Sequence, residues 1–290
     1  MCRVTSLWVY TSKSNKIGLI FLAIFGGIIA LIATNRINFM IPNMESNSIL
    51  IPTEEPGEDT SLDTFSAVAP PVFPLKLSSD SNVRYLVDQN NQPFFIVGEA
   101  AWSLIGQVSL EDAKLYLNDL AARGFNTVIV TLVEEYYTGK APKNYYGVAP
   151  YVPANDFSSP NDAYFSHADA IINYAASKGI LVILAPNYLG CCNDGWRSVL
   201  ENKNTVTDAA NYGTFIGNRY KNFPNLLYAW GNDMNPDNSN VRGKIDAMAR
   251  AVKAADPNHL HTFHARPENS SWKIMTSYNY DWIDFNSVYT

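Results

Sequence analysis

Acidic and amide side chains stand directly after short apolar segments of the chain, where they could transfer protons. The sharpest case is Asp233, which follows Asn232 in the segment Tyr228-Ala-Trp-Gly-Asn-Asp-Met-Asn-Pro236. A carboxyl group at the end of a buried strand can act as a general acid or base, while the neighbouring amide hydrogen-bonds a bound molecule. The same residues also favour a turn followed by a helix cap, so both interpretations of Asp233 stay open.

Polar and aromatic residues follow four other apolar segments in the same way. Glu99 could bind hydroxyl groups or form a buried ion pair, with Arg266 as the partner. Trp102 could offer a flat face for stacking or pack beneath a helix, and Glu134 could equally be a solvated residue at the start of a loop. Asn187 with Tyr188 follows a further apolar segment. The candidate binding residues are Glu99, Trp102, Glu134, Asn187, Asn232, His264 and Arg266.

Neither the histidines nor the cysteines form a pattern typical of a metal site. His261 and His264 lie three residues apart on one predicted strand, so they point to opposite faces and cannot easily share a metal ion. One of them is expected near the candidate site and the other in a supporting layer. Three cysteines, two of them adjacent, do not make a disulfide framework or a zinc site. We predict no metal and no cofactor.

The elements that must position these residues alternate between short apolar strands and amphipathic helices. A hairpin is predicted over 83–87 and 93–97, and Ser109 and Gly124 are the expected caps of the first helix. The predicted strands are 94–98, 127–132, 180–185, 226–230, 260–263 and 284–288. The predicted helices are 109–124, 168–178, 206–223 and 241–256.

Strand–helix alternation is typical of a parallel α/β sheet, which is either doubly wound or closed into a (β/α)8 barrel. No glycine-rich phosphate loop follows the first strand, as nucleotide-binding open sheets usually have. In a barrel the ends of all strands converge on one mouth, which brings the candidate residues together. We therefore predict an incomplete TIM-type (β/α)8 barrel with about six strands.

An uncharged run of 18 residues, Ile17 to Thr34, precedes this region. As a helix it would span about 27 Å, enough to cross the hydrocarbon core of a membrane. Lys13 and Lys16 lie before it, and such a basic flank stays on the cytoplasmic side, which places the barrel on the extracytoplasmic side. A signal anchor is favoured over a cleaved signal peptide, and either one exports the remainder.

Three regions follow from these observations. Residues 1–41 are predicted to hold a cytoplasmic tail and the transmembrane signal anchor. Residues 42–74, rich in Pro, Ser, Thr and acids, are predicted to form a flexible linker, and residues 75–290 the barrel. The net charge of −6 without a basic cluster argues against a nucleic-acid partner.

Several segments of residues 75–290 match one known family in order. The region resembles the apiosidase-like glycoside hydrolases, which implies a barrel of the large retaining hydrolase clan that cleaves glycosidic bonds in plant-type polysaccharides. The resemblance also implies that Asp233, at the end of the fourth strand, is the acid/base. Glu99 stands where the family commonly has aspartate, which could reshape the sugar site. The matching segments include Pro74-Leu-Lys-Leu-Ser78, Ala101-Trp-Ser-Leu104, Gly217-Asn-Arg-Tyr-Lys-Asn-Phe-Pro-Asn225, Gly231-Asn-Asp-Met-Asn-Pro236, His261-Thr-Phe-His-Ala-Arg266 and Trp282-Ile-Asp-Phe-Asn286.

Glycosidic cleavage needs two carboxyl groups, and the family's nucleophilic glutamate is expected on a seventh strand. No acid of this sequence occupies that position, so we expect a piece of a longer protein, or a truncated product, that is inactive by itself. An open barrel would expose sheet edges, which favours the first explanation. The alternative function is a non-catalytic, membrane-tethered carbohydrate-binding protein, and a weaker one is an anchored structural domain without a sugar ligand.

Overall fold

The computed structural model describes residues 21–24, 27–30, 70–80, 85–134, 139–190 and 195–289. The chain divides into two compact units, residues 1–65 and 66–290, and each is described by itself. Residues 42–69 of the predicted linker lie outside the described residues, as do the three cysteines.

In the first unit, strands β1 (Phe21–Ile24) and β2 (Gly27–Ala30) pair antiparallel, with Phe21 opposite Ala30. These eight residues belong to the predicted membrane helix, and strands stand there instead. Isoleucine and phenylalanine favour strands, which is the physical reason for the difference. The remainder of the predicted helix lies outside the described residues. Among those that are described, no helix has the length and apolar character to cross a membrane.

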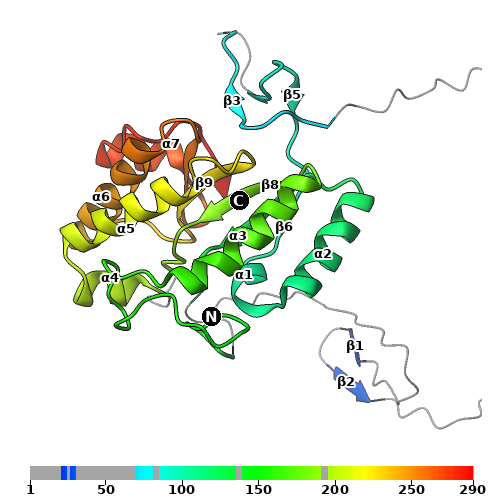
Figure 1. Cartoon of the computed structure of the whole chain (residues 1–290), viewed down its shortest axis with the longest axis horizontal. Coiled ribbons are helices and arrows are strands. Elements are labelled where there is room, and N and C mark those ends of the chain that lie inside the picture. Colours follow the sequence, from blue (N-terminus) through cyan, green and yellow to red (C-terminus); the bar gives the residue numbers. More distant parts are fainter. Residues whose placement is uncertain are drawn as a thin grey trace, which may run out of the picture. The chain divides into compact units, whose positions relative to one another are not determined.

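A five-stranded parallel sheet forms the centre of the second unit. Its spatial order follows the chain order, so each strand pairs with the next along the sequence (Figure 1). A doubly wound sheet reverses direction at a switch point, whereas a barrel does not, so this order fits the predicted barrel. The strands are β6 (Gly98–Ala100), β7 (Thr127–Thr131), β8 (Leu181–Ala185), β9 (Leu226–Gly231) and β10 (His261–His264).

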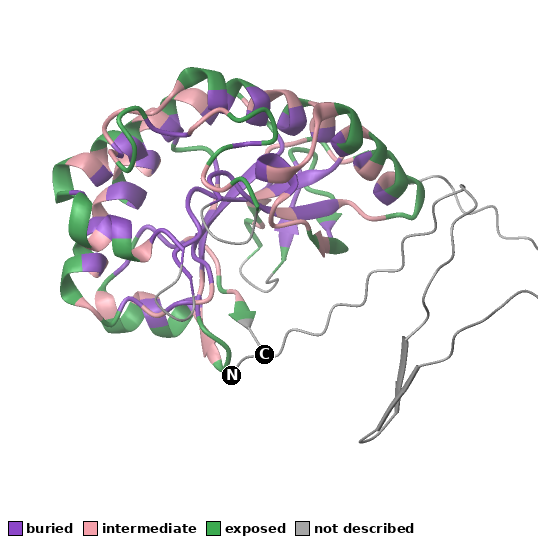
Figure 2. Ribbon diagram, turned by 90° about the horizontal axis from the view of Figure 1, so that it is seen from below, coloured by how far each residue is buried: buried purple, intermediate pink, exposed green. Residues whose placement is uncertain are grey.

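Helices cover the outer side of this sheet. In Figure 2 they lie in an arc around the strands, and their buried residues line its inner side. Ser109 caps the second helix by accepting a hydrogen bond from the backbone N–H of Asp112, and Gly124 follows that helix with a φ of 81°, which confirms both caps. The helices are α1 (Leu104–Gln107), α2 (Leu110–Ala122), α3 (Asp162–Ser177), α4 (Arg197–Lys203), α5 (Val206–Tyr220), α6 (Ser239–Ala255) and α7 (Ser271–Tyr278).

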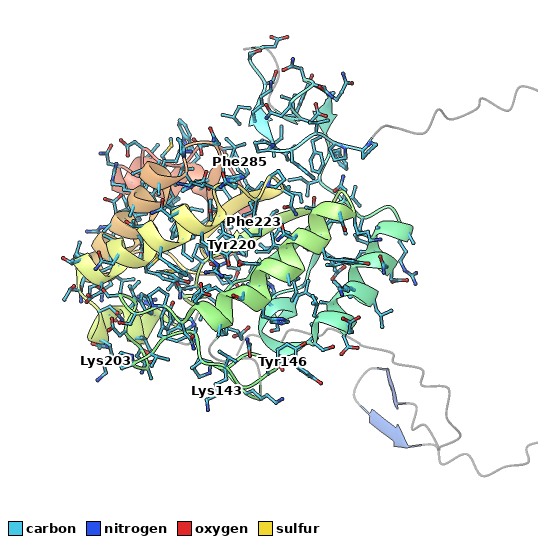
Figure 3. All side chains as sticks on the ribbon, in the orientation of Figure 1. Lys143, Tyr146, Lys203, Tyr220, Phe223 and Phe285 are labelled. Atoms are coloured by element: carbon cyan, nitrogen blue, oxygen red, sulfur yellow. The ribbon has the colours of Figure 1, made fainter. Side chains whose placement is uncertain are left out.

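Helices α5 and α6 approach each other closely. A Cβ atom on Gly213 would overlap the carbonyl oxygen of Met248, and one on Gly217 would lie 2.7 Å from the Cβ of Ala255. At the end of α5, the Tyr220 ring meets the ring of Phe223 edge-on at 5.2 Å (Figure 3). This helix pair therefore depends on residues without side chains at the contact.

The predicted sixth strand over 284–288 is wrong. The backbone N–H of Asp284 donates to the carbonyl of His261 (2.8 Å), so this segment does lie beside β10. However, Thr262 uses its hydroxyl to reach the carbonyl of Phe285 (3.0 Å), and this side-chain bond takes the place of a regular ladder. The assigned strand is β12 (Val288–Tyr289), which pairs antiparallel with β11 (Asn269–Ser270). The parallel sheet in the described residues thus has five strands.

A small antiparallel sheet precedes the strands of the parallel sheet and confirms the predicted hairpin. It consists of β3 (Lys76–Leu77), β4 (Leu86–Val87) and β5 (Pro93–Phe94). Leu86 and Phe94 of this sheet, with Leu75 just before β3, form one core with Leu181 and Leu227, which stand near the starts of β8 and β9. The small sheet therefore packs at the end of the strands opposite to Asp233.

Candidate active site

Asp233 stands in an unusual turn directly after β9. Gly231, Asn232 and Asp233 have φ values of 87°, 60° and 63°, so three consecutive residues lie in the left-handed region. A Cβ atom on Gly231 would lie 2.5 Å from the ring of Phe263, so only glycine fits there. Left-handed residues other than glycine persist only where the surrounding structure holds them, and they cluster at functional sites.

Two side chains contact the Asp233 carboxyl group, one at each oxygen. The hydroxyl of Tyr188 donates to Oδ2 at 3.5 Å, and Nε2 of His264 lies 3.6 Å from Oδ1. The side chain of Asp233 is 22% exposed and that of His264 is 20% exposed. The acid is therefore mostly shielded from water, but solvent or a ligand can still reach it.

An aromatic wall stands beside this acid. The Trp102 ring stacks on the imidazole of His264 at 5.7 Å with 11° between the planes, and it meets the ring of Tyr188 edge-on at 6.2 Å. The four residues Trp102, Tyr188, Asp233 and His264, called the Asp233 cluster below, come from four different strand ends. The structure thus brings together Asp233, His264 and Trp102 of the predicted site residues.

The charge state of His264 follows from its surroundings. Burial lowers the pKa of its imidazole below the ordinary value, and the nearby Asp233 carboxylate opposes that shift only in part. The imidazole is therefore neutral at pH 7 and carries a single N–H. A neutral imidazole with Nε2 facing a carboxylate acts as the donor of that contact.

Two buried amides at the same edge have unused hydrogen-bonding capacity. Asn232 is fully buried, and neither its amide nitrogen nor its amide oxygen has a hydrogen-bond partner among the described residues. Asn187 donates from its nitrogen to the hydroxyl of Tyr151 (2.9 Å), while its oxygen lacks a partner in the same part of the chain. Leaving a buried polar group unpaired costs about 1–3 kcal/mol, so these amides suit a polar ligand.

Glu134 lies at the end of β7 and is buried. Its Oε2 accepts a hydrogen bond from the hydroxyl of Ser103 (3.1 Å), just before α1. A Cβ atom on Gly106 would lie 3.1 Å from the Cβ of Glu134, so α1 packs closely over this acid. The structure therefore places Glu134 under α1, held by Ser103, rather than in a solvated loop.

Glu99 lies away from the Asp233 cluster. It pairs in register with Val128, whose side chain packs in the helix-facing core with Leu117 of α2. Residues opposite each other on adjacent strands point to the same face, so Glu99 also faces the helices. Its charge adds to burial in raising the pKa of Tyr116 on α2 to about 12.

Arg266 is exposed and does not form the predicted alternative ion pair with Glu99. Its backbone N–H donates to Oδ1 of Asn235 at 3.4 Å, which links the loop after β10 to the turn after β9. Within the described ranges its guanidinium has no ion-pair partner. Those ranges also contain no group of three or more His, Cys, Asp and Glu side chains that could hold a metal ion.

Sequence reasoning placed Tyr188 beside Asn187 at a strand end but gave it no role, and it did not select Ser103. The structure places Tyr188 after β8, with its hydroxyl directed to Asp233. Ser103 gives no comparable signal, because its contact with Glu134 depends on how α1 folds back over β7.

Several solved structures are similar to this chain. A solved glycoside hydrolase shares 30% identity, with a TM-score of 0.62, over 73% of this chain and 45% of its own. A glycoside hydrolase family 5 protein from Bacteroides vulgatus shares 28% identity, with a TM-score of 0.62, over 74% and 43%. A family 5 mannosidase from Rhizomucor miehei shares the fold alone, at 14% identity and a TM-score of 0.51, over 69% and 57%.

The chain thus spans less than half the length of the first two solved structures. No curated protein matches the chain. The family described as "Apiosidase-like, catalytic domain" matches residues 80–290, which are most of the sequence. The chain therefore belongs to the apiosidase-like family of glycoside hydrolases.

Proposed function

We propose that Asp233 is the general acid/base of a retaining glycoside hydrolase. The placement of Asp233 supports this proposal. Its carboxyl group is largely shielded from solvent at the end of the fourth barrel strand, and Tyr188 and His264 each contact one of its oxygens. In this role Asp233 gives its proton to the departing glycosidic oxygen and then takes a proton from the attacking water. Its partial exposure leaves room for the leaving group to approach.

The residues around Asp233 supply the contacts for a sugar. The buried amide of Asn232 has both its nitrogen and its oxygen available within the described structure, so it can donate to one hydroxyl and accept from another. Asn187 adds an available oxygen. Trp102 is half-buried and offers an aromatic edge at the rim of the site.

Retaining hydrolysis needs a second carboxyl group about 5–5.5 Å from the first. We propose that in the whole protein a glutamate of a later barrel strand supplies it, because the solved relatives are more than twice as long as the part that this chain matches. The substrate we propose is an O-glycosidic bond in a plant-type polysaccharide or oligosaccharide, with apiose as the released sugar. Apiose is proposed as the released sugar because the matching family is described as apiosidase-like.

Asp233→Asn tests this proposal in the full-length protein with aryl apiosides as substrates. Removing the acid should lower kcat on phenyl apioside by roughly 10²–10⁴-fold, the usual contribution of a general acid. On 2,4-dinitrophenyl apioside kcat/KM should fall much less, because that leaving group needs no proton in the first step. Asp237→Asn, an exposed acid of the same loop, is the matched control and should keep its activity. Unchanged turnover in Asp233→Asn contradicts the assignment.

A non-catalytic carbohydrate-binding protein is the second candidate function. It is favoured by the available amides of Asn187 and Asn232, which need no carboxyl group to hold a sugar. In that case oligosaccharide binding should be saturable and survive Asp233→Ala, while no reducing sugar is released. Release of reducing sugar by the wild-type protein rejects this candidate.

We also propose that residues 17–34 anchor the protein in a membrane, with the barrel on the extracytoplasmic side. The support is their uncharged composition and the basic residues Lys13 and Lys16 before them. Full-length protein should stay with membranes after carbonate extraction, and a variant without residues 17–34 should not. External protease should reach the barrel in spheroplasts, and protection of the barrel would contradict this orientation.

A further inference from the structure

We propose that His264 is a positioning residue that orients the Asp233 carboxyl group, with Trp102 fixing the imidazole plane. The sequence predicted His264 as a substrate contact, and this proposal gives it a different part in the same site. It rests on the proposed function of Asp233 as the acid/base. Its basis is the contact geometry of β10 with the turn after β9.

The first observation is the direction of the imidazole. Nε2 of His264 faces Oδ1 of Asp233 at 3.6 Å, while the hydroxyl of Tyr188 reaches Oδ2 at 3.5 Å. Each carboxyl oxygen therefore has its own neighbour from a different strand. A carboxyl group contacted on both oxygens keeps the orientation of its plane, which proton transfer to a glycosidic oxygen requires.

The second observation is the support of the imidazole itself. Trp102 stacks flat on it, and the same indole meets Tyr188 edge-on. The carbonyl of Trp102 accepts a hydrogen bond from the backbone N–H of Thr131 (2.9 Å), which ties this residue to β7. Both neighbours of the carboxyl group thus rest on one aromatic ring that is anchored to the sheet.

The third observation is that the end of β10 also holds the backbone of the acid. The Phe263 ring and the carbonyl oxygen of His264 lie where a side chain on Gly231 would be. One residue beyond Ala265, the N–H of Arg266 bonds the side chain of Asn235. His264 therefore belongs to a continuous contact surface against the left-handed turn, which is the position expected of a residue that orients Asp233 rather than the sugar.

The experiment compares His264→Gln and His264→Ala in the full-length protein on phenyl and 2,4-dinitrophenyl apiosides. If His264 orients the acid, kcat on the phenyl substrate should fall about tenfold or more in His264→Ala. On the dinitrophenyl substrate kcat/KM should change less than about threefold, because its first step needs no proton, and KM should not rise on either substrate. Glutamine keeps an N–H donor and should restore part of the loss. A rise in KM on both substrates with unchanged kcat would show a sugar contact and overturn the proposal.

His167→Gln is the matched control, since His167 lies on α3 and contacts Tyr146 rather than the Asp233 cluster. It should leave both kcat values unchanged. Thermal unfolding of each variant separates a lost contact from a loss of folding.

A second measurement, by NMR, tests the proposal without requiring a substrate to be hydrolysed. The chain has four histidines, so the side-chain ¹⁵N signals of His264 can be assigned by substitution. We expect the Nε2–H tautomer at pH 7 and a shift of those signals in Asp233→Ala. If neither apioside is hydrolysed by the wild-type protein, the proposed substrate fails while this test still stands. Signals of His264 that do not respond to Asp233→Ala would overturn the proposal.

Discussion

Nε2 of His264 lies 3.6 Å from Oδ1 of Asp233, and this contact joins the end of β10 to the turn after β9. The two residues are neighbours only because adjacent parallel strands end at the same edge of the sheet. The Asp233 carboxylate favours a charged His264 imidazole, while burial disfavours it. The pair therefore offers a direct electrostatic test of the site.

The pKa of His264 should fall further when Asp233 is replaced by asparagine. The Asp233 carboxylate raises this pKa against the lowering effect of burial, so removing its charge leaves burial unopposed. An NMR titration of the His264 ring in wild-type protein and Asp233→Asn measures the difference. A pKa that rises in the variant would show that Asp233 does not carry the charge that the imidazole senses.

The protein should lose stability as the pH falls from about 7 to 5.5. Burial lowers the pKa values of His167, His261 and His264 in the folded protein, so the unfolded chain binds more protons in this window. Because unfolding then takes up protons, the free energy of unfolding decreases as the pH drops through the ordinary histidine pKa near 6.5. Urea unfolding at the two pH values measures this change.

His261→Gln is the variant that tests the source of this pH dependence. His261 is fully buried and accepts a hydrogen bond from the indole N–H of Trp230 (3.2 Å), which a glutamine oxygen can also accept. The loss of stability between the two pH values should be smaller in this variant. An equal loss in both proteins would place the proton uptake elsewhere.

Much of the parallel α/β sheet could be predicted because its signals are local. Alternating apolar strands and capped helices repeat along the chain, and Ser109 caps α2 as predicted. The segment after β10 was not predictable in this way. There the hydroxyls of Thr262, Ser271 and Ser287 bond one another and nearby carbonyls, so tertiary contacts replace a regular ladder.

The site was predictable where a strand end was placed correctly. Asp233 and His264 follow or close strands with clear apolar cores, and both lie in the Asp233 cluster. Glu99 differs in position from the expectation, because the predicted strand ended at Gly98, whereas β6 spans Gly98–Ala100. A shift of this size turns a residue expected at the mouth into one that faces the helices, because successive strand residues alternate in direction.

The contact between α5 and α6 gives a stability prediction with an internal control. Gly213→Ala should destabilise the protein by about 1–3 kcal/mol, because its Cβ overlaps the carbonyl oxygen of Met248. Gly243→Ala lies on the exposed side of α6 with no atom within 4 Å of the new Cβ, so it should stabilise by about 0.5–1 kcal/mol. Chemical denaturation measures both, and equal effects would contradict the packing.

Removing the hydroxyl of Tyr188 should weaken catalysis without affecting substrate affinity. Tyr188→Phe deletes the donor to Oδ2 of Asp233, a contact of 3.5 Å, and a hydrogen bond contributes about 0.5–1.5 kcal/mol. We expect kcat on phenyl apioside to fall by a few-fold with KM unchanged. Tyr174→Phe removes a hydroxyl on α3 that bonds Asn118, and it should leave kcat unaltered. A loss confined to KM would place Tyr188 against the sugar.

Gly231→Ala should damage both folding and catalysis, since this glycine begins the turn that carries Asp233. Alanine at a φ of 87° costs roughly 1–2 kcal/mol, and its Cβ would lie 2.5 Å from the Phe263 ring, which adds about 1–3 kcal/mol of overpacking. Phe263→Leu makes space for that Cβ, so the double variant should be less destabilised than the two single variants together. Its kcat should stay low, because the φ strain that displaces Asp233 is still present. Strictly additive losses in chemical denaturation would show that the Phe263 ring does not hold the turn.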